Sequence, residues 1–247
     1  MNPKDLFSGN APEYAAFRPD YPIELYDFIF SHVSDFSTAW DCGTGNGQSA
    51  KVLSGKFGSV HATDISDKQM ANGYKSPNIF YSVSSAEHTS FQPAMFGLIT
   101  VAQAAHWFNL DKFYDEVVRV AKPKCVLAVW GYGLLSINAA FDERLQYFYK
   151  NIIGPYWDIE RRLLDEEYKT ISFPFKEIPV PVFHFSKQWD IAHLHGYLNT
   201  WSAVQKFIKV NAFNPVDGFL ENAQSLLGKG LMEIHFPLFF RVGYVNR

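Results

Sequence analysis

A glycine-rich turn between a strand and a helix constrains the fold of this chain more than any other feature. Apolar residues begin a strand-like run at 39–40, and residues 41–48 then read D-C-G-T-G-N-G-Q. A helical pattern follows from Gln48 to Leu53. Glycine lets the backbone come very close to a ligand, and ligands of open α/β sheets bind beyond the carboxyl ends of the strands. The turn therefore predicts an α/β fold with a binding site at this position.

The spacing of the glycines separates this turn from that of a dinucleotide-binding protein. A dinucleotide fingerprint reads G-x-G-x-x-G, whereas this chain has Gln48 at the third glycine position and Gly47 one place earlier. A short-chain dehydrogenase would also need Tyr-x-x-x-Lys, and no tyrosine here is followed by lysine four places on. Both observations weaken the hypothesis of a nicotinamide-dependent dehydrogenase.

Two later strand ends carry polar residues that suit a nucleoside. The run Val60 to Thr63 ends at Asp64, and Ser85-Ala86-Glu87 follows the run Ile79 to Val83. A carboxylate at the end of a second strand accepts hydrogen bonds from both hydroxyls of a ribose. The alternative for Asp64 is a helix N-cap. The order and spacing of the three signals favour a nucleoside-containing cofactor.

Strand-like and helical runs alternate along the first half of the chain. Strand-like runs lie near 38–42, 59–63, 79–83, 97–102 and 125–131, with helical patterns between them. This alternation predicts a parallel, doubly wound sheet. Further on, 134–153, 158–170, 190–209 and 216–227 look helical, while 180–189 and 237–245 look like strands. We expect one domain over 1–247. Its core spans about 35–133 plus strands within 180–189 and 232–247, and a cap is formed by 1–34 and about 134–230.

Composition narrows the classes of partner. The formal net charge is −3, and Arg161-Arg162 is the only adjacent pair of positive charges, so duplex nucleic acid is not expected as a partner. Two distant cysteines favour a reducing compartment and no metal site. The polar start lacks an apolar signal core, and no run reaches transmembrane length. We expect a cytoplasmic protein without membrane contact. The aromatic content of 17% suggests an aromatic-walled pocket as well as a packed core.

In its glycine spacing, D-x-G-x-G-x-G, this chain resembles the class I S-adenosylmethionine (SAM) methyltransferases. Asp64 and Ser85-Ala86-Glu87 support the resemblance. Other segments resemble the small-molecule branch that includes trans-aconitate methyltransferase, and together they cover nearly the whole chain. They are residues 14–22, Gln103-Ala104-Ala105-His106-Trp107-Phe108, Tyr156-Trp157 with Arg161, and 200–204. One departure is Phe96-Gly97, where relatives often carry Phe-Asp at the start of the fourth strand. The resemblance implies a Rossmann-like, seven-stranded, mostly parallel sheet with an antiparallel C-terminal hairpin and a helical cap.

The resemblance and the strand-end positions assign residues to SAM. We expect Gly43, Gly45 and Gly47 to lie against the methionine moiety, and Asp64 to hold the ribose. Ile65 would flank the adenine, with Ala86 and Glu87 near the adenine edge. Gln103 and Ala104 would line the floor below the sulfonium. Tyr14 and Arg18 would close over the cofactor, with Arg18 pairing its carboxylate; the alternative for Arg18 is a surface ion pair. The full expected set is Tyr14, Arg18, Gly43, Gly45, Gly47, Gln48, Asp64, Ile65, Ala86, Glu87, Gln103 and Ala104.

Methyl transfer from a sulfonium needs little help beyond orientation, so no metal or covalent intermediate is required. His106 and Trp107 follow the fourth strand, where reacting groups lie in such sheets. His106 could accept a proton from a hydroxyl or amine, or donate a hydrogen bond to a carboxylate. The structural alternative is a partly buried histidine that is hydrogen-bonded to the backbone. We assign His106 as the catalytic candidate and expect substrate contacts from Tyr21, Trp107, Trp157, Arg161 and Trp201.

We expect a small metabolite as the methyl acceptor, with a carboxylate as the leading candidate. Methylation of a hydroxyl or amine with His106 as base, and a SAM-binding protein without turnover, stay open as alternatives. The Asn/Asp-Pro-Pro-aromatic motif of DNA amino-group methylation is missing after the fourth strand. His193 and His195 have no obvious third metal ligand, so we expect them on a solvent-facing helix. The oligomeric state is not assigned.

Overall fold

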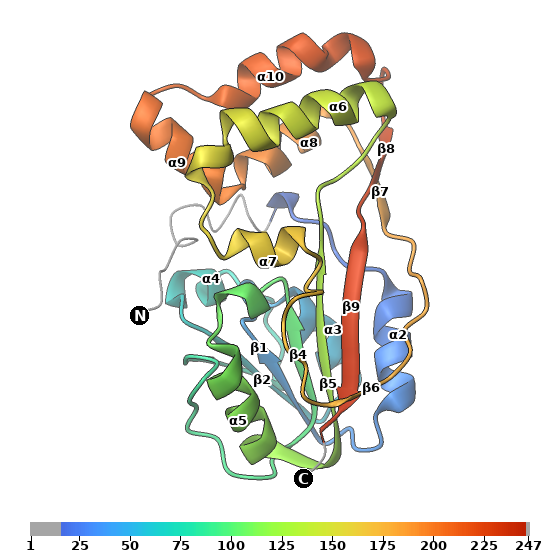
Figure 1. Ribbon diagram of the computed structural model, residues 1–247. Coiled ribbons are helices and arrows are strands. Elements are labelled where there is room, and N and C mark those ends of the chain that lie inside the picture. The colour runs from blue at the N-terminus through green and yellow to red at the C-terminus, as the bar shows by residue number, and fades with distance from the viewer. Residues whose placement is uncertain (1–15, 246–247) are drawn as a thin grey trace.

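The computed structural model describes residues 16–245, in which a central sheet is topped by a helical cap (Figure 1). The order of the strands across the central sheet is β3-β2-β1-β4-β5-β9-β6. A separate two-stranded sheet is formed by β7 and β8. The nine strands are β1 (Thr38–Cys42), β2 (Ser59–Asp64), β3 (Ile79–Val83), β4 (Phe96–Ala102), β5 (Ala121–Tyr132), β6 (Lys176–Glu177), β7 (Ser186–Trp189), β8 (Met232–His235) and β9 (Leu238–Tyr244).

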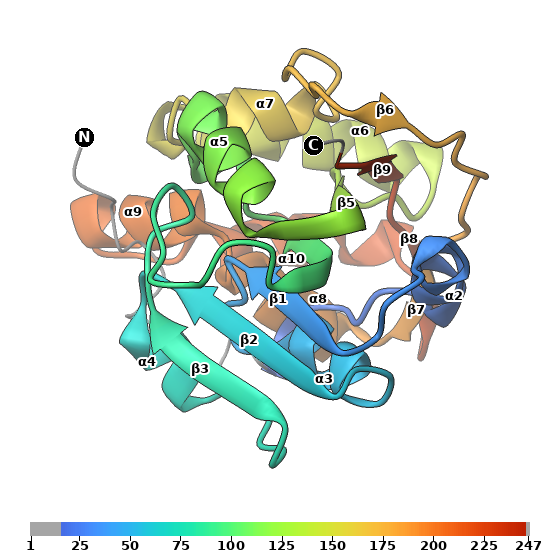
Figure 2. The same ribbon diagram turned by 90° about the horizontal axis from the view of Figure 1, so that it is seen from below.

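The helices of the first half of the chain cover both faces of the sheet. They are α2 (Ile23–His32), α3 (Gln48–Ser54), α4 (Asp67–Ala71), the 3-10 turn η1 (Ala105–Trp107) and α5 (Leu110–Val120). α2 and α3 pack on one face of the sheet and α5 packs on the other. Successive residues of a strand point to opposite faces, so each strand contributes apolar side chains to both clusters. Ala39, for example, belongs to the first face and Trp40 to the second. Figure 2 shows the twist from β1 to β3.

The helices of the second half form the cap, with its own apolar core. They are α6 (Ala139–Tyr147), the π turn η2 (Phe148–Ile152), the 3-10 turn η3 (Gly154–Tyr156), α7 (Arg161–Asp165), α8 (Ile191–Asn199), α9 (Ser202–Asn211), α10 (Pro215–Ala223) and the 3-10 turn η4 (Gln224–Leu226). Figure 1 shows α7 between the sheet and the other cap helices, and α7 contacts η1. The helix expected over 190–209 is divided at Thr200–Trp201, where Trp201 is extended.

The antiparallel side of the sheet differs in detail from the expectation. β9 pairs antiparallel with β5, as the run 237–245 predicts, but its other neighbour is the two-residue strand β6. We expected a strand within 180–189 to belong to the central sheet, and that prediction is wrong. The strand found there, β7, pairs with β8 in the separate sheet. Pro179 and Pro181 lack backbone N–H groups and cannot extend a ladder beside β9. The last bond on that edge is donated by Ile178 N–H to the Val242 carbonyl, at 2.8 Å.

β1 and β4 are neighbours in the sheet, although β2 and β3 lie between them in the sequence. Strand order reverses at this point, so a crevice opens beyond the carboxyl ends of these two strands. The glycine turn follows β1 and the Gln103–Trp107 segment follows β4, and the cap lies over both (Figure 1). The fold therefore brings together the segments that the sequence analysis assigned to the cofactor and to the substrate.

Candidate active site

The glycine turn is left-handed at each of its three glycines. The φ angles are 68° at Gly43, 55° at Gly45 and 79° at Gly47. A Cβ at Gly43 would lie 2.6 Å from Cβ of Ala104, and one at Gly47 would lie 2.1 Å from the hydroxyl of Tyr81. A Cβ at Gly45 would have no neighbour within 4 Å. Two glycines are therefore required by the protein's own packing, whereas Gly45 turns an open backbone surface outward, as close approach of a cofactor requires.

Asp64 is tied to the glycine turn. Its Oδ2 accepts from the Gly45 N–H and its Oδ1 from the Ser66 N–H, both at 2.9 Å. The N-cap of α4 is Ser66, whose side chain accepts from Gln69 N–H, so Asp64 is not that cap. Carboxylates accept about four hydrogen bonds. Asp64 can thus hold the turn in place and also accept from the hydroxyls of a ribose.

A second carboxylate, Asp41, fixes the turn from below. It is buried and accepts from the hydroxyls of Thr44 (2.5 Å) and Thr100 (2.8 Å), and from the N–H of Ala50 (3.1 Å). Burial raises the pKa of Asp41 to about 6, against the opposing effect of these three bonds. No role was predicted for Asp41 from sequence, although its position as the first residue of the glycine motif was a usable signal.

The residues expected around the adenine occupy different environments. Ile65 is exposed and Ala86 is buried in the core. The carboxylate of Glu87 accepts from the N–H of Asn109 at 2.8 Å, which ties the turn after β3 to the start of α5. The Gln48 amide donates to the carbonyl of Arg18 at 3.3 Å. Gln48 therefore links the first turn of α3 to the N-terminal segment.

The segment after β4 is pinned to the end of β5. Gln103 is left-handed, with φ 56°, and its side chain pairs with the backbone of Tyr132. Its Oε1 accepts from the N–H at 2.9 Å, and its Nε2 donates to the carbonyl at 3.2 Å. Ala104 is buried directly against Gly43. These contacts hold the backbone after β4 against the glycine turn, as the expected floor of the site requires.

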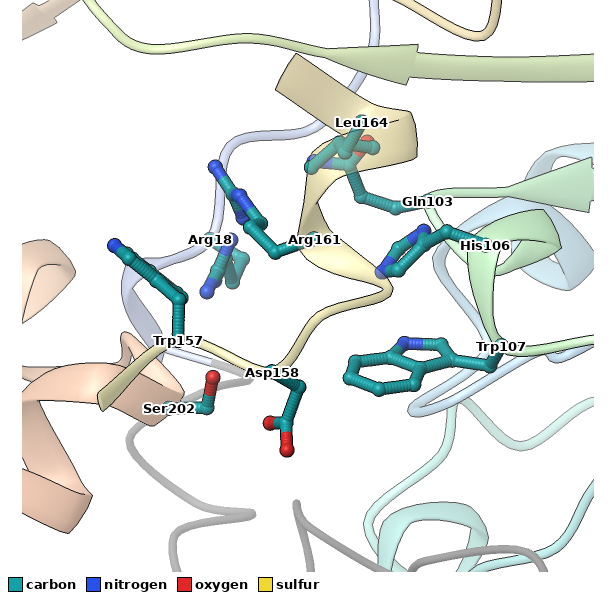
Figure 3. Close-up of a pocket in the computed structure, with 9 residues that line it drawn as sticks. All are labelled: Arg18, Gln103, His106, Trp107, Trp157, Asp158, Arg161, Leu164 and Ser202. Atoms are coloured by element: carbon teal, nitrogen blue, oxygen red, sulfur yellow. The ribbon is translucent and has the colours of Figure 1, made fainter. Parts of the chain in front are cut away.

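A pocket that is partly open to solvent lies between this segment and the cap (Figure 3). Four of the six residues expected for catalysis and substrate contact line it, together with two of those expected for the cofactor. Its lining residues are Arg18, Gln103, His106, Trp107, Trp157, Asp158, Arg161, Leu164 and Ser202. Tyr21 and Trp201 are not among them. Tyr21 packs on Trp130 and Tyr132, and the buried Trp201 packs behind Trp157.

Arg161 is held by an aromatic clamp. Its guanidinium lies 4.6 Å from the ring centre of Trp157, and its Nε donates to the hydroxyl of Tyr149 at 2.9 Å. Asp165 accepts from the same Nε at 3.3 Å. Within residues 16–245, neither Nη atom of Arg161 forms a hydrogen bond. Because only Nε is engaged, the two terminal nitrogens can bind an anion in the pocket.

The other charged groups of the pocket have protein partners. The Nη1 of Arg18 donates to the hydroxyl of Tyr132 at 2.9 Å, and its guanidinium lies over the ring of Tyr197. These contacts place Arg18 in the pocket wall. Asp158 pairs with Lys206 at 2.5 Å. Two guanidinium groups therefore line the pocket, and that of Arg161 also pairs with Asp165 through its Nε at 3.3 Å.

His106 is buried and points into the pocket from η1 (Figure 3). Its Nδ1 lies 2.8 Å from the hydroxyl of Tyr168, so its partner is a side chain and not the backbone. Burial, and then the charge of Arg161, lower the pKa of His106 to about 3. The imidazole is therefore neutral at physiological pH. No residue pattern in the sequence had indicated Tyr168 as its partner.

His193 and His195 are both half-buried on α8. The side chain of His195 is 44% exposed, which agrees in part with the expected solvent-facing helix. His193 packs on Phe17 and Trp189, and His195 contacts Asp217 at 2.8 Å. In the part of the chain that the structure describes, no group of three or more His, Cys, Asp or Glu side chains is arranged to hold a metal ion.

Tyr14 lies outside the described residues. Among residues 16–245, no helix is long and apolar enough to cross a membrane.

Comparison with known proteins identifies the family. Residues 40–129 match the model of a methyltransferase domain. A methyltransferase-family protein of Dictyostelium discoideum is 36% identical over 83% of this chain and 80% of its own length. The methyltransferase cfoB of Aspergillus candidus is 26% identical over 69% of this chain and 63% of its own. A methyltransferase structure from Anaeromyxobacter dehalogenans aligns with a TM-score of 0.84 and 32% identity, covering 93% of this chain and 98% of that one. The chain belongs to the class I SAM-dependent methyltransferases, and SAM is its methyl donor.

Proposed function

We propose that this enzyme methylates a carboxylate oxygen of a small, partly apolar metabolite. The observation that carries the proposal is the guanidinium of Arg161, clamped against Trp157 with both terminal nitrogens facing no protein acceptor among the described residues. A planar guanidinium matches a carboxylate in a two-point contact. The indole walls of Trp107 and Trp157 would cover the apolar part of the substrate.

The state of His106 supports a carboxylate over a hydroxyl or amine. SAM supplies a methyl group on a sulfonium, which is already an activated electrophile. A carboxylate is ionised at neutral pH and needs no base to accept the methyl. A hydroxyl or amine would need one, and a general base works best when its pKa lies near the operating pH. Because the pKa of His106 is lowered to about 3, the imidazole is a poor base and serves better as a neutral hydrogen-bond donor.

The same pocket argues against a protein that only binds SAM. The lining side chains come from the N-terminal segment, from the segment after β4, from residues 157–158, from α7 and from the start of α9. They surround a space beside the proposed sulfonium floor at Gln103. We assign SAM to Gly45, Asp64, Ile65 and Glu87, as the sequence analysis did. We also propose one functional unit over 1–247 and a cytoplasmic location, the latter supported by the free, buried thiols of Cys42 and Cys125.

The test is turnover with trideuteriomethyl SAM over a panel of small carboxylates, alcohols, phenols and amines. The proposal expects products that carry the labelled methyl as an ester, so that mild alkali releases it as methanol. Labelled methyl that resists alkali on the best acceptor would contradict the carboxylate assignment.

A pair of adjacent arginines provides a matched control. Arg161→Gln removes a charge-assisted contact worth about 1.5–3 kcal/mol, so kcat/KM should fall roughly 10- to 150-fold. Arg162→Gln removes the neighbouring charge, whose side chain is 72% exposed and pairs with Glu166, and should leave kcat/KM unchanged. Equal effects of the two substitutions would exclude Arg161 as the anchor.

A further inference from the structure

Tyr168 lies in a conformation that few residues of its type adopt. Glu167 and Tyr168 both have φ 55°, a left-handed region that strains residues with a Cβ. The segment turns back on α7, and the Tyr168 N–H donates to the carbonyl of Leu163 at 2.9 Å. The side chain is fully buried, with its ring edge-on to Phe239 at 5.0 Å. This turn aims a phenol from the cap at the sheet.

The phenol of Tyr168 contacts the imidazole of His106. The Tyr168 hydroxyl lies 2.8 Å from Nδ1 of His106, and both groups are buried. The two residues are separated by 62 positions in the chain, one in the cap and one on η1 after β4. Strained backbone conformations cluster at functional sites, where the surrounding structure enforces them. Here the strained residue contacts a side chain that lines the pocket.

The direction of this hydrogen bond follows from the surroundings of the hydroxyl. Burial raises the pKa of Tyr168 well above its usual range, so the phenol keeps its proton. Within residues 16–245, Nδ1 of His106 is the only hydrogen-bond partner of the Tyr168 hydroxyl. A fully buried hydroxyl whose proton has no acceptor would cost about 1–3 kcal/mol, so the proton is directed at Nδ1 of His106. A neutral imidazole that accepts at Nδ1 carries its own proton on Nε2.

We propose that Tyr168 is a positioning residue that fixes His106 as the Nε2–H tautomer and so presents a neutral N–H donor to the substrate in the pocket. The identity of the acceptor, a carboxylate oxygen, rests on the proposed function, whereas the tautomer does not. Arg161 would bind the charge of the carboxylate and His106 would orient it. The charged groups around the imidazole are Arg161 itself, Arg18 and Asp158, the last paired with Lys206.

The direct test is nitrogen NMR of the full-length enzyme labelled with ¹⁵N-histidine. The variant His106→Asn assigns the His106 signals by their disappearance. We expect the Nδ1 shift of an unprotonated nitrogen and the Nε2 shift of a protonated one, with no titration near neutral pH. A protonated Nδ1 in the wild-type enzyme would overturn the inference without any variant having to fold.

Tyr168→Phe should move both His106 signals toward the average of the two tautomers. Tyr114→Phe is the matched control: Tyr114 belongs to the same apolar cluster, and its hydroxyl donates to the Ser172 carbonyl at 2.7 Å, away from His106. It should leave the His106 signals in place. Unchanged signals in folded Tyr168→Phe enzyme, as judged by its thermal melt, would also overturn the inference.

Kinetics separate this inference from the proposed function. With a carboxylate substrate, Tyr168→Phe should raise KM by roughly 2- to 10-fold with little change in kcat, because it loosens a binding contact. If no carboxylate is methylated, the proposed function fails while the NMR result still decides the tautomer. If carboxylates are methylated and Nδ1 carries the proton, only the role of Tyr168 is wrong.

Discussion

Gly45→Ala separates folding from cofactor binding in a way that few substitutions can. A Cβ at Gly45 would meet no atom of the protein within 4 Å, so the substitution creates no internal clash. Its cost to folding is the left-handed backbone, since φ is 55°, and this costs about 1–2 kcal/mol for a residue with a Cβ. The variant should therefore fold with a modest loss of stability.

SAM binding should fall as well, for a separate reason. If the cofactor lies against the backbone of Gly45, the new methyl occupies its space, and crowding of this kind costs about 1–3 kcal/mol, or roughly 5- to 150-fold in affinity. The assay is calorimetric titration with SAM and with S-adenosylhomocysteine, beside urea unfolding of the same samples. Both ligands should lose affinity, because the methionine moiety is common to them.

Gly230→Ala is the matched control. Gly230 is also left-handed, with φ 90°, and a Cβ there also meets nothing within 4 Å. It lies in the loop before β8, remote from the glycine turn. It should lose comparable stability and keep the affinity of the wild-type enzyme for SAM. Undiminished SAM affinity in folded Gly45→Ala would refute the placement of the cofactor against this turn.

Two carboxylates give further predictions. Asp64→Ala should weaken SAM binding, by up to about 1.5–3 kcal/mol for each ribose hydroxyl that loses its acceptor, whereas Asp67→Ala, on the exposed first turn of α4, should not; equal titration curves for the two variants would exclude a ribose contact. For Asp41, the folded pKa of about 6 exceeds the unfolded value of about 3.9, so the folded state binds more protons between these values and stability falls as pH rises through them. Asp41→Asn should remove that fall, which amounts to about 2 kcal/mol between pH 4 and 7. Parallel urea-unfolding profiles of variant and wild type against pH would contradict the raised pKa.

Local patterns predicted the parts of the site that depend on neighbours in sequence. The spacing of Gly43, Gly45 and Gly47 indicated a turn against a cofactor, and all three are left-handed. The ends of β1, β2, β3 and β4 were predictable because short apolar runs that take turns with helical patterns along the chain indicate buried parallel strands. Since such strands end at one edge of the sheet, His106 and Trp107 could be placed beside the cofactor site from sequence.

Contacts between distant segments were not predictable in the same way. The partner of His106 is a tyrosine 62 positions away, in a turn whose two left-handed residues carry no glycine to signal them. Tyr21 and Trp201 are aromatic, like the side chains that line the pocket. Their positions behind Tyr132 and Trp157 depend on tertiary packing, which the local sequence does not indicate. The pairing of β7 with β8 depends likewise on the whole cap.

The central claim, that this methyltransferase acts on an already ionised carboxylate, is tested most directly by the dependence of kcat on pH with its best acceptor. The neutral, weakly basic His106 predicts a flat profile between about pH 6 and 9, in wild type and in His106→Ala alike, because no proton is removed in the transfer step. The substitution should then act mainly on KM. A kcat that rises through a pKa near neutrality in the wild type, and is about 10²–10⁴-fold lower and flat in His106→Ala, would contradict the account and make His106 the general base.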